Sequence, residues 1–206
     1  MSDDTTLSKF VERYNEGQLP WDDVQPPPEV MALAAGLQPG RVLDLGCGYG
    51  RTALYLAQQG WQVDGVDFVP QAIAEAQKRA TAASLSERIH FHVASVTELG
   101  FLPGRYQCGV DVGCFHALDE AQQKAYHVEL CRLLEPGSPF LLFVRMQEEN
   151  QSEEGPHGVS ETAVKALFAQ GFTLDKTEIG VTEVGEKSWK SGWFWFRRES
   201  KDGSLC

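Results

Sequence analysis

The chain contains one glycine-rich turn directly after an apolar run. Residues 42–50 have the sequence Val-Leu-Asp-Leu-Gly-Cys-Gly-Tyr-Gly, which places glycines at positions 46, 48 and 50. Glycine is needed where the backbone turns sharply or where a ligand must lie against bare main chain. A turn of this kind at the carboxyl end of a first strand favours a nucleotide-type cofactor. This segment is therefore the first candidate binding site.

The spacing of the glycines indicates which kind of cofactor the turn would bind. A dinucleotide-binding turn would have its third glycine at position 51, but that residue is Arg51 and the third glycine is Gly50. Asp44 lies shortly before the first glycine. A carboxylate there would repel a pyrophosphate that it faced, and it would suit the amino group of a methionine moiety. The pattern argues against a nicotinamide-dependent dehydrogenase.

A second carboxylate ends the next predicted strand. Asp67 closes the run Val-Asp-Gly-Val-Asp at residues 63–67. A carboxylate at this position can accept hydrogen bonds from both hydroxyls of a ribose. Asp64 is the competing candidate, but it lies in mid-strand, where we expect it to face a helix or solvent. The alternative for Asp67 is a helix cap or a surface charge.

Strands and helices alternate around these carboxylates. The predicted strands are 41–45, 62–67, 89–94, 108–112 and 140–144. The predicted helices are 29–35, 52–59, 70–83 and 119–134, with a further short helix at 7–14. Alternation at this spacing predicts a mostly parallel sheet with helices on both faces.

The last part of the chain follows another pattern. A helix is predicted at 160–169, followed by strands at 172–179 and 191–197. No helix separates these two strands, so we expect an antiparallel pair at the edge of the sheet. Residues 193–196 are Trp-Phe-Trp-Phe, and one aromatic pair should face the core because strand residues alternate between faces.

The length of the chain favours a single domain over residues 1–206. With 206 residues, of which 42% are apolar, the chain can build one sizeable core, and a second full domain would be cramped. We expect an N-terminal cap segment at 1–36 and a catalytic core at 37–200. Prolines at 26–28 block a helix in the cap segment. Trp21 is either a core aromatic residue or part of a flap that covers the cofactor.

Charge and cysteine content limit the partners and the compartment. The net charge is −11, which disfavours phosphate backbones and anionic membranes. The apolar run at 140–144 is too short to span a bilayer, and the polar first residues do not resemble a signal peptide. Five cysteines without a CxxC pair indicate free thiols in a reducing cytosol. We therefore expect a cytoplasmic protein without nucleic-acid or membrane partners.

Residues 41–144 resemble the class I S-adenosylmethionine-dependent methyltransferases. The resemblance rests on the glycine-rich turn, on the acidic end of the second strand and on the Leu-Glu-Pro-Gly turn at 134–137 before the fifth strand. It implies a Rossmann-like three-layer α/β sandwich with a seven-stranded, mostly parallel sheet and an antiparallel last strand. It also implies S-adenosyl-L-methionine as cofactor and methyl transfer as the reaction.

The same resemblance implies which residues contact the cofactor. The residues that would line the methionine end are Asp44, Gly46, Cys47 and Gly48. The residues that would hold the ribose and flank or adjoin the adenine are Asp67, Phe68, Ser95 and Val96. Relatives commonly carry an aspartate where this chain has a serine at position 95, and the hydroxyl can still contact the adenine amine.

A narrower resemblance concerns the segment after the fourth strand. Residues 111–118, Asp-Val-Gly-Cys-Phe-His-Ala-Leu, together with Pro-Trp-Asp at 20–22, are similar to the thiol, thiopurine and tellurite-resistance methyltransferases. This resemblance implies a small-molecule acceptor with a soft nucleophile such as a thiol. Asp111 is then either a wall near the sulfonium or a solvated strand end. His116 is either a general base near the acceptor or a structural histidine.

Other functions fit the sequence less well. A protein-directed methyltransferase and a non-catalytic cofactor-binding interaction module remain the alternatives. Amino-directed nucleic-acid enzymes of this fold carry an Asn/Asp-Pro-Pro-aromatic motif after the fourth strand, where this chain has Asp-Val-Gly-Cys. His90 and His92 share one strand face, but no third ligand is evident nearby, so we expect no metal site.

Overall fold

The computed structural model describes residues 11–12, 14, 22–148, 158–185 and 187–200. Its seven strands have the order β3-β2-β1-β4-β5-β7-β6. The pairs β1–β2, β2–β3 and β4–β5 are parallel, and β7 is antiparallel to both β5 and β6. The predicted α/β fold with an antiparallel last strand is therefore confirmed. The chain divides into two compact units, residues 1–96 and 97–206, and the single domain over 1–206 stays a prediction.

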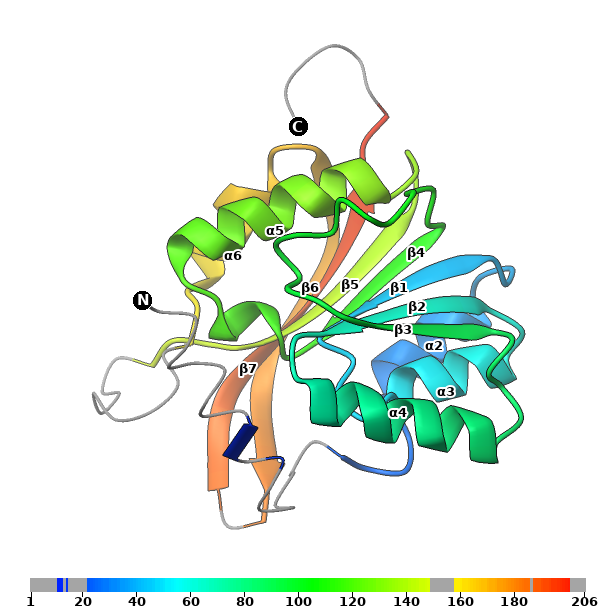
Figure 1. Cartoon of the computed structure of the whole chain (residues 1–206). Coiled ribbons are helices and arrows are strands. Elements are labelled where there is room, and N and C mark those ends of the chain that lie inside the picture. The colour runs from blue at the N-terminus through cyan, green and yellow to red at the C-terminus, as the bar shows by residue number, and fades with distance from the viewer. Residues whose placement is uncertain (1–10, 13, 15–21, 149–157, 186, 201–206) are drawn as a thin grey trace. The chain divides into compact units, whose positions relative to one another are not determined.

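The first unit alternates helices and parallel strands. Its elements are α2 (Pro28–Ala35), β1 (Arg41–Leu45), α3 (Arg51–Gln58), β2 (Gln62–Asp67), α4 (Pro70–Ala82) and β3 (Ile89–Val93). Helices α3 and α4 contact each other and the strands β2 and β3 (Figure 1). The predicted strands and helices of this unit are present, with ends that differ by a residue or so from those expected.

The local sequence explains why α4 begins and packs as it does. Pro70 stands in its first turn, where the missing N–H costs no hydrogen bond and the fixed φ favours a helix. The buried residues Ala72, Ile73, Ala76 and Ala80 form one stripe at helical spacing. Small side chains in this stripe let the helix lie close to β2 and β3.

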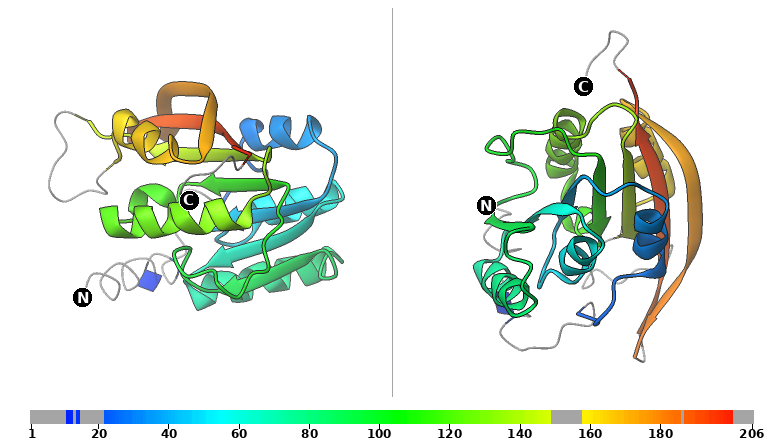
Figure 2. Two further views of the ribbon diagram at one scale, coloured as in Figure 1. Left: turned by 90° about the horizontal axis from the view of Figure 1, so that it is seen from above. Right: turned by 90° about the vertical axis from the view of Figure 1, so that its right-hand side faces the viewer.

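The second unit holds the antiparallel part of the sheet. Its elements are β4 (Cys108–Val112), the 3-10 helix η1 (Phe115–Ala117), α5 (Glu120–Leu133), β5 (Pro139–Arg145), α6 (Glu161–Phe168), β6 (Phe172–Val184) and β7 (Lys187–Arg198). Asp119 caps α5 by accepting a hydrogen bond from the main chain of Gln122, whose side chain bonds back to Asp119. Helices α5 and α6 lie against each other, as two further views show (Figure 2).

An aromatic cluster fills the space between α5, α6 and the strands of this unit. Phe168 on α6 is fully buried, and its ring lies 4.6 Å from that of Phe196 and 5.6 Å from that of Phe140. Phe194 and Phe196 are buried, whereas Trp193 and Trp195 are half-buried. The alternation predicted for residues 193–196 is therefore confirmed.

The β6–β7 hairpin is longer than predicted. We expected strands at 172–179 and 191–197, but the pairing continues to Val184 and Lys187. The pairing of β7 with β5 ends where Arg145 meets Ser191, and among the described residues the outer part of β7 pairs in register with β6 alone. Most of its side chains are exposed, and the weak alternation of apolar residues there hid it from the sequence pattern.

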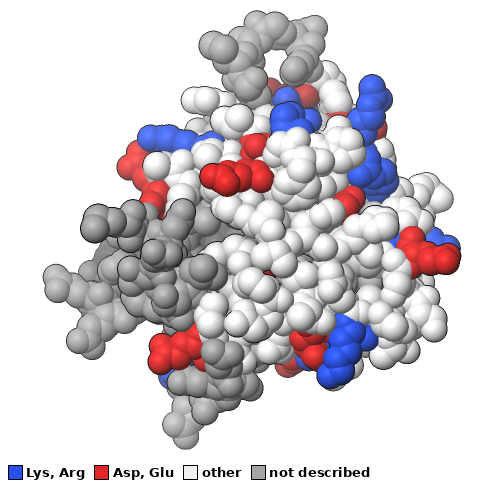
Figure 3. Space-filling model, viewed as in Figure 1, with Lys and Arg blue, Asp and Glu red and all other residues white. Residues whose placement is uncertain are grey.

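The described residues include no helix that is long and apolar enough to span a membrane. On the face of the molecule shown in Figure 3, Lys and Arg side chains lie among Asp and Glu side chains and do not gather into one positive patch. The predicted helix at 7–14 falls largely outside the described residues, although residues 11, 12 and 14 are helical.

Replacing Phe168 by alanine should lower the free energy of unfolding by about 3–5 kcal/mol, because a buried ring would leave a cavity among other rings. Urea unfolding monitored by circular dichroism measures this change. The matched control is Phe101→Ala, since Phe101 is 53% exposed and its loss should cost less than about 1 kcal/mol. Equal losses in the two variants would contradict the proposed core.

Candidate functional site

The glycine-rich turn joins β1 to α3 and is held by main-chain hydrogen bonds. The amides of Gly46 and Cys47 donate to the carbonyl of Val66, at 2.8 and 3.0 Å. The glycines at 46, 48 and 50 have φ values of 67°, 54° and 80°, a left-handed conformation that side chains with a Cβ rarely adopt. The turn therefore requires glycine at these positions for its backbone path alone.

Close packing against a ring also requires glycine at position 50 of the turn and at position 65 of β2. A Cβ atom on Gly50 would lie 2.8 Å from Cζ of Phe91, and one on Gly65 would lie 2.7 Å from Cδ1 of the same ring. Both distances are shorter than carbon atoms can approach. The ring of Phe91 on β3 therefore packs against bare main chain of the turn and of β2.

The carboxylate of Asp67 ties the end of β2 to the turn. One of its oxygens accepts a hydrogen bond from the amide of Gly48 at 3.0 Å, and the other accepts one from the amide of Val69 at 2.9 Å. The side chain is buried, with 6% exposure. Burial raises the pKa of Asp67, and the two amide hydrogen bonds oppose this rise. Each carboxylate oxygen retains a further lone pair for a ligand hydroxyl.

The residues predicted for the adenine end meet beside Asp67. The amide of Ala94, just after β3, donates to the carbonyl of Asp67 at 3.1 Å. This bond brings the following residues, Ser95 and Val96, next to the end of β2. Phe68 is half-buried and packs against the cluster around Val69. The structure thus brings together the residues expected at the ribose and the adenine.

Asp44 is buried in β1, near the start of the turn. Its charge acts on Arg51, the first residue of α3. Burial lowers the pKa of the Arg51 guanidinium, and the carboxylates of Asp23, Asp44 and Asp22 oppose that change. Asp44 thus supplies a buried acidic side chain close to where the methionine end of the cofactor is expected.

Two ion pairs connect the N-terminal cap segment to helices α4 and α3 of the first unit. The carboxylate of Asp22 accepts two hydrogen bonds from the guanidinium of Arg79 on α4, at 2.7 and 2.8 Å. This two-bond geometry is the strong form of the pair. The guanidinium also lies over the ring of Tyr49, and Asp23 pairs with Arg51. The sequence pattern missed this contact because its partners lie far apart in the chain.

Tyr14 provides a second contact of the cap segment. Its ring is buried among Val69 and Ala72 and lies 5.1 Å from that of Tyr49. A Cβ atom on Gly48 would lie 3.1 Å from the Tyr14 hydroxyl oxygen. Tyr14 therefore lies against the glycine-rich turn, whereas Trp21, predicted as flap or core aromatic, lies outside the described residues.

Asp111 organises the turn that follows β4 in the second unit. Its carboxylate accepts hydrogen bonds from the amides of Cys114 and Phe115, at 2.8 and 3.1 Å, and from the hydroxyl of Tyr126 at 2.8 Å. The side chain is fully buried, so the alternative of a solvated strand end is wrong. Burial raises the pKa of Asp111 to about 7, against the effect of these bonds. Its role near the sulfonium stays a prediction.

His116 on η1 uses one ring nitrogen within the protein. Its Nδ1 accepts a hydrogen bond from the amide of Arg145 at 3.3 Å, so the neutral ring carries its proton on Nε2. Burial, together with the charge of Arg145, lowers the pKa of His116 to about 4. The only lone pair of the neutral ring is therefore occupied, which is unfavourable for a general base.

Asp64 and the pocket found in the structure lie away from the glycine-rich turn. Asp64 is buried and bonded to Arg41 and His92 on the neighbouring strands, at 3.2 and 2.8 Å, so the alternative that it faces solvent is wrong. The described residues contain no group of side chains that could hold a metal ion.

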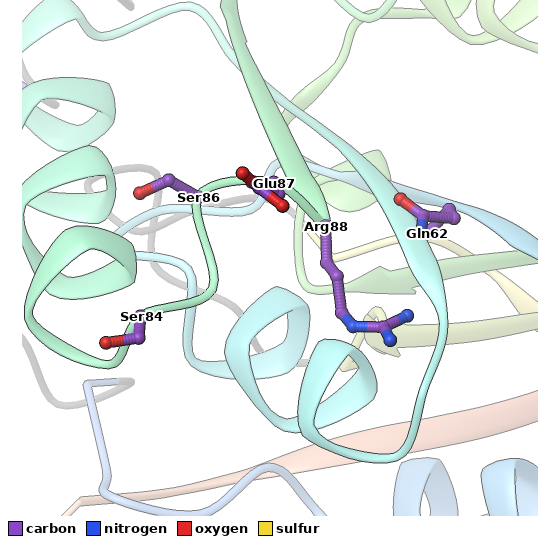
Figure 4. Close-up of a pocket in the computed structure, with 5 residues that line it drawn as sticks. All are labelled: Gln62, Ser84, Ser86, Glu87 and Arg88. Atoms are coloured by element: carbon purple, nitrogen blue, oxygen red, sulfur yellow. The ribbon is translucent and has the colours of Figure 1, made fainter.

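A pocket opens at the amino ends of β2 and β3, far along the strands from the glycine-rich turn (Figure 4). Its lining residues are Gln62, Ser84, Ser86, Glu87 and Arg88.

Comparison with known proteins places this geometry in a family. Residues 42–137 match the family model described as a methyltransferase domain. The 2-heptyl-1-hydroxyquinolin-4(1H)-one methyltransferase of Mycobacteroides abscessus is 32% identical over 158 residues, which cover 76% of this chain and 69% of that protein.

Two solved structures share the fold over most of their length. One, described as concerning the conversion of a disulfide bond into a thioacetal group during echinomycin biosynthesis, has a TM-score of 0.76 and 26% identity, with 93% of this chain and 92% of that chain covered. The 1,6-didemethyltoxoflavin-N1-methyltransferase of Burkholderia thailandensis, solved with bound S-adenosylhomocysteine, has a TM-score of 0.72 and 23% identity, with 94% and 87% covered. The chain therefore belongs to the S-adenosylmethionine-dependent methyltransferases and is an enzyme that uses S-adenosylmethionine.

Proposed function

We propose that this enzyme methylates a small molecule at a nucleophile that ionises without help from a protein base, such as a thiol or an acidic hydroxyl. The observation that carries the proposal is the hydrogen bond from the Arg145 amide to Nδ1 of His116, which occupies the lone pair that a base would use. A thiol with a pKa near 8.5 is partly ionised at neutral pH. A weakly acidic alcohol or an amine would need a base in this position.

The relatives support a small acceptor. The name of the Mycobacteroides abscessus relative gives a quinolone with an N-hydroxyl group as its substrate. The description of the echinomycin structure concerns sulfur chemistry on a natural product. The net charge of −11 also disfavours a nucleic-acid acceptor.

We propose that the cofactor binds to residues of the first unit. The Asp67 carboxylate would accept hydrogen bonds from the ribose hydroxyls, since its oxygens already face the turn. The main chain of Gly46, Cys47 and Gly48 would lie along the methionine end, with Asp44 beneath it. The side chains proposed at the adenine are Phe68, Ser95 and Val96, and Trp21 remains proposed as part of the cover.

In methyl transfer the main task of the protein is to position the acceptor relative to the cofactor. S-adenosylmethionine supplies a methyl carbon activated by a sulfonium, with a neutral thioether as leaving group. The protein must hold the acceptor in line with that carbon and exclude water, and such positioning contributes on the order of 7–11 kcal/mol. In this proposal Asp111 acts as a positioning residue, because its carboxylate fixes the turn that carries His116.

Replacing Asp67 by alanine should weaken the binding of S-adenosylhomocysteine by about 1.5–3 kcal/mol, because hydrogen bonds between a carboxylate and the ribose hydroxyls would be lost. Isothermal titration calorimetry measures the affinity. Asp64→Ala is the matched control in the same strand, since Asp64 bonds to Arg41 and His92 and should leave the affinity unchanged. Unchanged affinity in Asp67→Ala would show that the site has been misplaced.

The acceptor class is tested by methyl transfer from labelled S-adenosylmethionine. We expect transfer to at least one member of a panel that contains small aromatic thiols and 2-heptyl-1-hydroxyquinolin-4(1H)-one. A mixture of bacterial proteins serves as the macromolecular arm. Label found only in protein would favour a protein-directed enzyme, and cofactor binding without any transfer would favour a non-catalytic module.

A further inference from the structure

Arg145 lies at the carboxyl end of β5, and no described carboxylate pairs with it. The arginines that pair with carboxylates in the described chain are Arg41, Arg51, Arg79, Arg132 and Arg197. Among the described residues no such pair is formed by Arg145, and its Nε is buried without a hydrogen-bond partner. A buried donor left unbonded costs free energy, and in a chain of net charge −11 carboxylates are plentiful. The arrangement therefore suggests that a ligand supplies the missing acceptor.

His116 adds a second donor at the same place. Its Nδ1 accepts the hydrogen bond from the main chain of Arg145 itself, which leaves the proton on Nε2. Within the described part of the chain, that second nitrogen forms no hydrogen bond. The positive charge of Arg145 also contributes to the lowered pKa of His116.

An aromatic surface borders the two donors. The guanidinium of Arg145 lies 5.6 Å from the centre of the Trp189 ring on β7. Arg145 pairs in register with Ser191, and Phe143, on the same face of β5, pairs with Trp193. The rings of Phe143 and Trp193 are 4.8 Å apart. A planar ligand could thus rest against apolar rings while its polar edge meets the donors.

We propose that Arg145 and His116 bind an anionic group of a planar aromatic methyl acceptor. This inference rests on the proposed function, because it names the substrate class of the same reaction. A guanidinium stabilises an anionic sulfur or oxygen in its vicinity and so favours the ionised acceptor. Ligands of parallel α/β sheets bind at the carboxyl ends of the strands, which is where these two residues lie. The acceptor would then need no base from the protein.

Binding of a matched pair of probes tests the inference without requiring methyl transfer. Benzoate is a planar anion and benzamide is its neutral counterpart. With the enzyme saturated with S-adenosylhomocysteine, ligand-observed NMR titration should show benzoate binding about ten-fold more tightly than benzamide. In Arg145→Gln this preference should fall to about one, while benzamide binding stays the same.

Three further variants separate the site from general effects. Lys190→Gln removes an exposed cation next to Trp189 on β7, and this variant should still prefer benzoate to benzamide. His116→Phe should reduce the preference, and His116→Gln, which retains an N–H donor, should restore part of it. An unchanged affinity for S-adenosylhomocysteine shows that each variant is folded.

The outcomes distinguish this inference from the proposed function. Equal binding of the two probes to the unmodified enzyme, or a preference that survives Arg145→Gln, would overturn the anion site even if small thiols are methylated. A preference lost equally in Lys190→Gln would also overturn it, since the effect would then be general electrostatics. If the preference depends on Arg145 but no small molecule is methylated, the anion site stands and the proposed function fails.

Discussion

The hydrogen bonds of the Asp67 carboxylate hold together three parts of the first unit. One oxygen binds the amide of Gly48 in the glycine-rich turn, and the other binds the amide of Val69 at the start of α4. The carboxylate itself closes β2. Because the side chain is buried, each bond is made in a low dielectric, where a lost partner is costly. The cofactor end of the unit therefore depends on one charged group whose position is fixed before any ligand binds.

The described cap residues extend this arrangement. Tyr14 packs beside Val69, and the Asp22–Arg79 ion pair fastens the segment to α4, the helix that begins after Asp67. Asp22 and Asp23 pair with Arg79 and Arg51. The buried carboxylate of Asp44 would favour the ammonium group of a cofactor bound beside it.

Local sequence predicted the elements of the fold well. The strands of the parallel part are apolar runs closed by glycine or polar residues, and glycine at positions 46, 48 and 50 reports a backbone conformation that only glycine adopts readily. The place of Asp67 at the end of β2 could be predicted because it follows from the strand pattern, whereas its contact with the cofactor stays a prediction. Strand ends and glycine turns of this kind are determined by a few neighbouring residues, so they can be predicted before the fold is known.

The parts that were missed depend on contacts between distant segments. Asp22 meets Arg79 across much of the first unit, and Asp111 is buried because Tyr126 of α5 folds over it. Whether His116 can act as a base depends on the amide that β5 places against it. Neither the residue type nor its neighbours in sequence determine such partners, so the sequence alone left open whether Asp111 is buried and which group bonds to His116.

In this proposal the Asp67 carboxylate holds the ribose of the cofactor while it fixes the glycine-rich turn. A crystal structure of the enzyme with S-adenosylhomocysteine would show whether it does so. We expect both ribose hydroxyls within hydrogen-bond distance of the Asp67 oxygens, with the amino-acid end along Gly46 to Gly48. A ribose bound elsewhere, with Asp67 still bonded only to Gly48 and Val69, would contradict it.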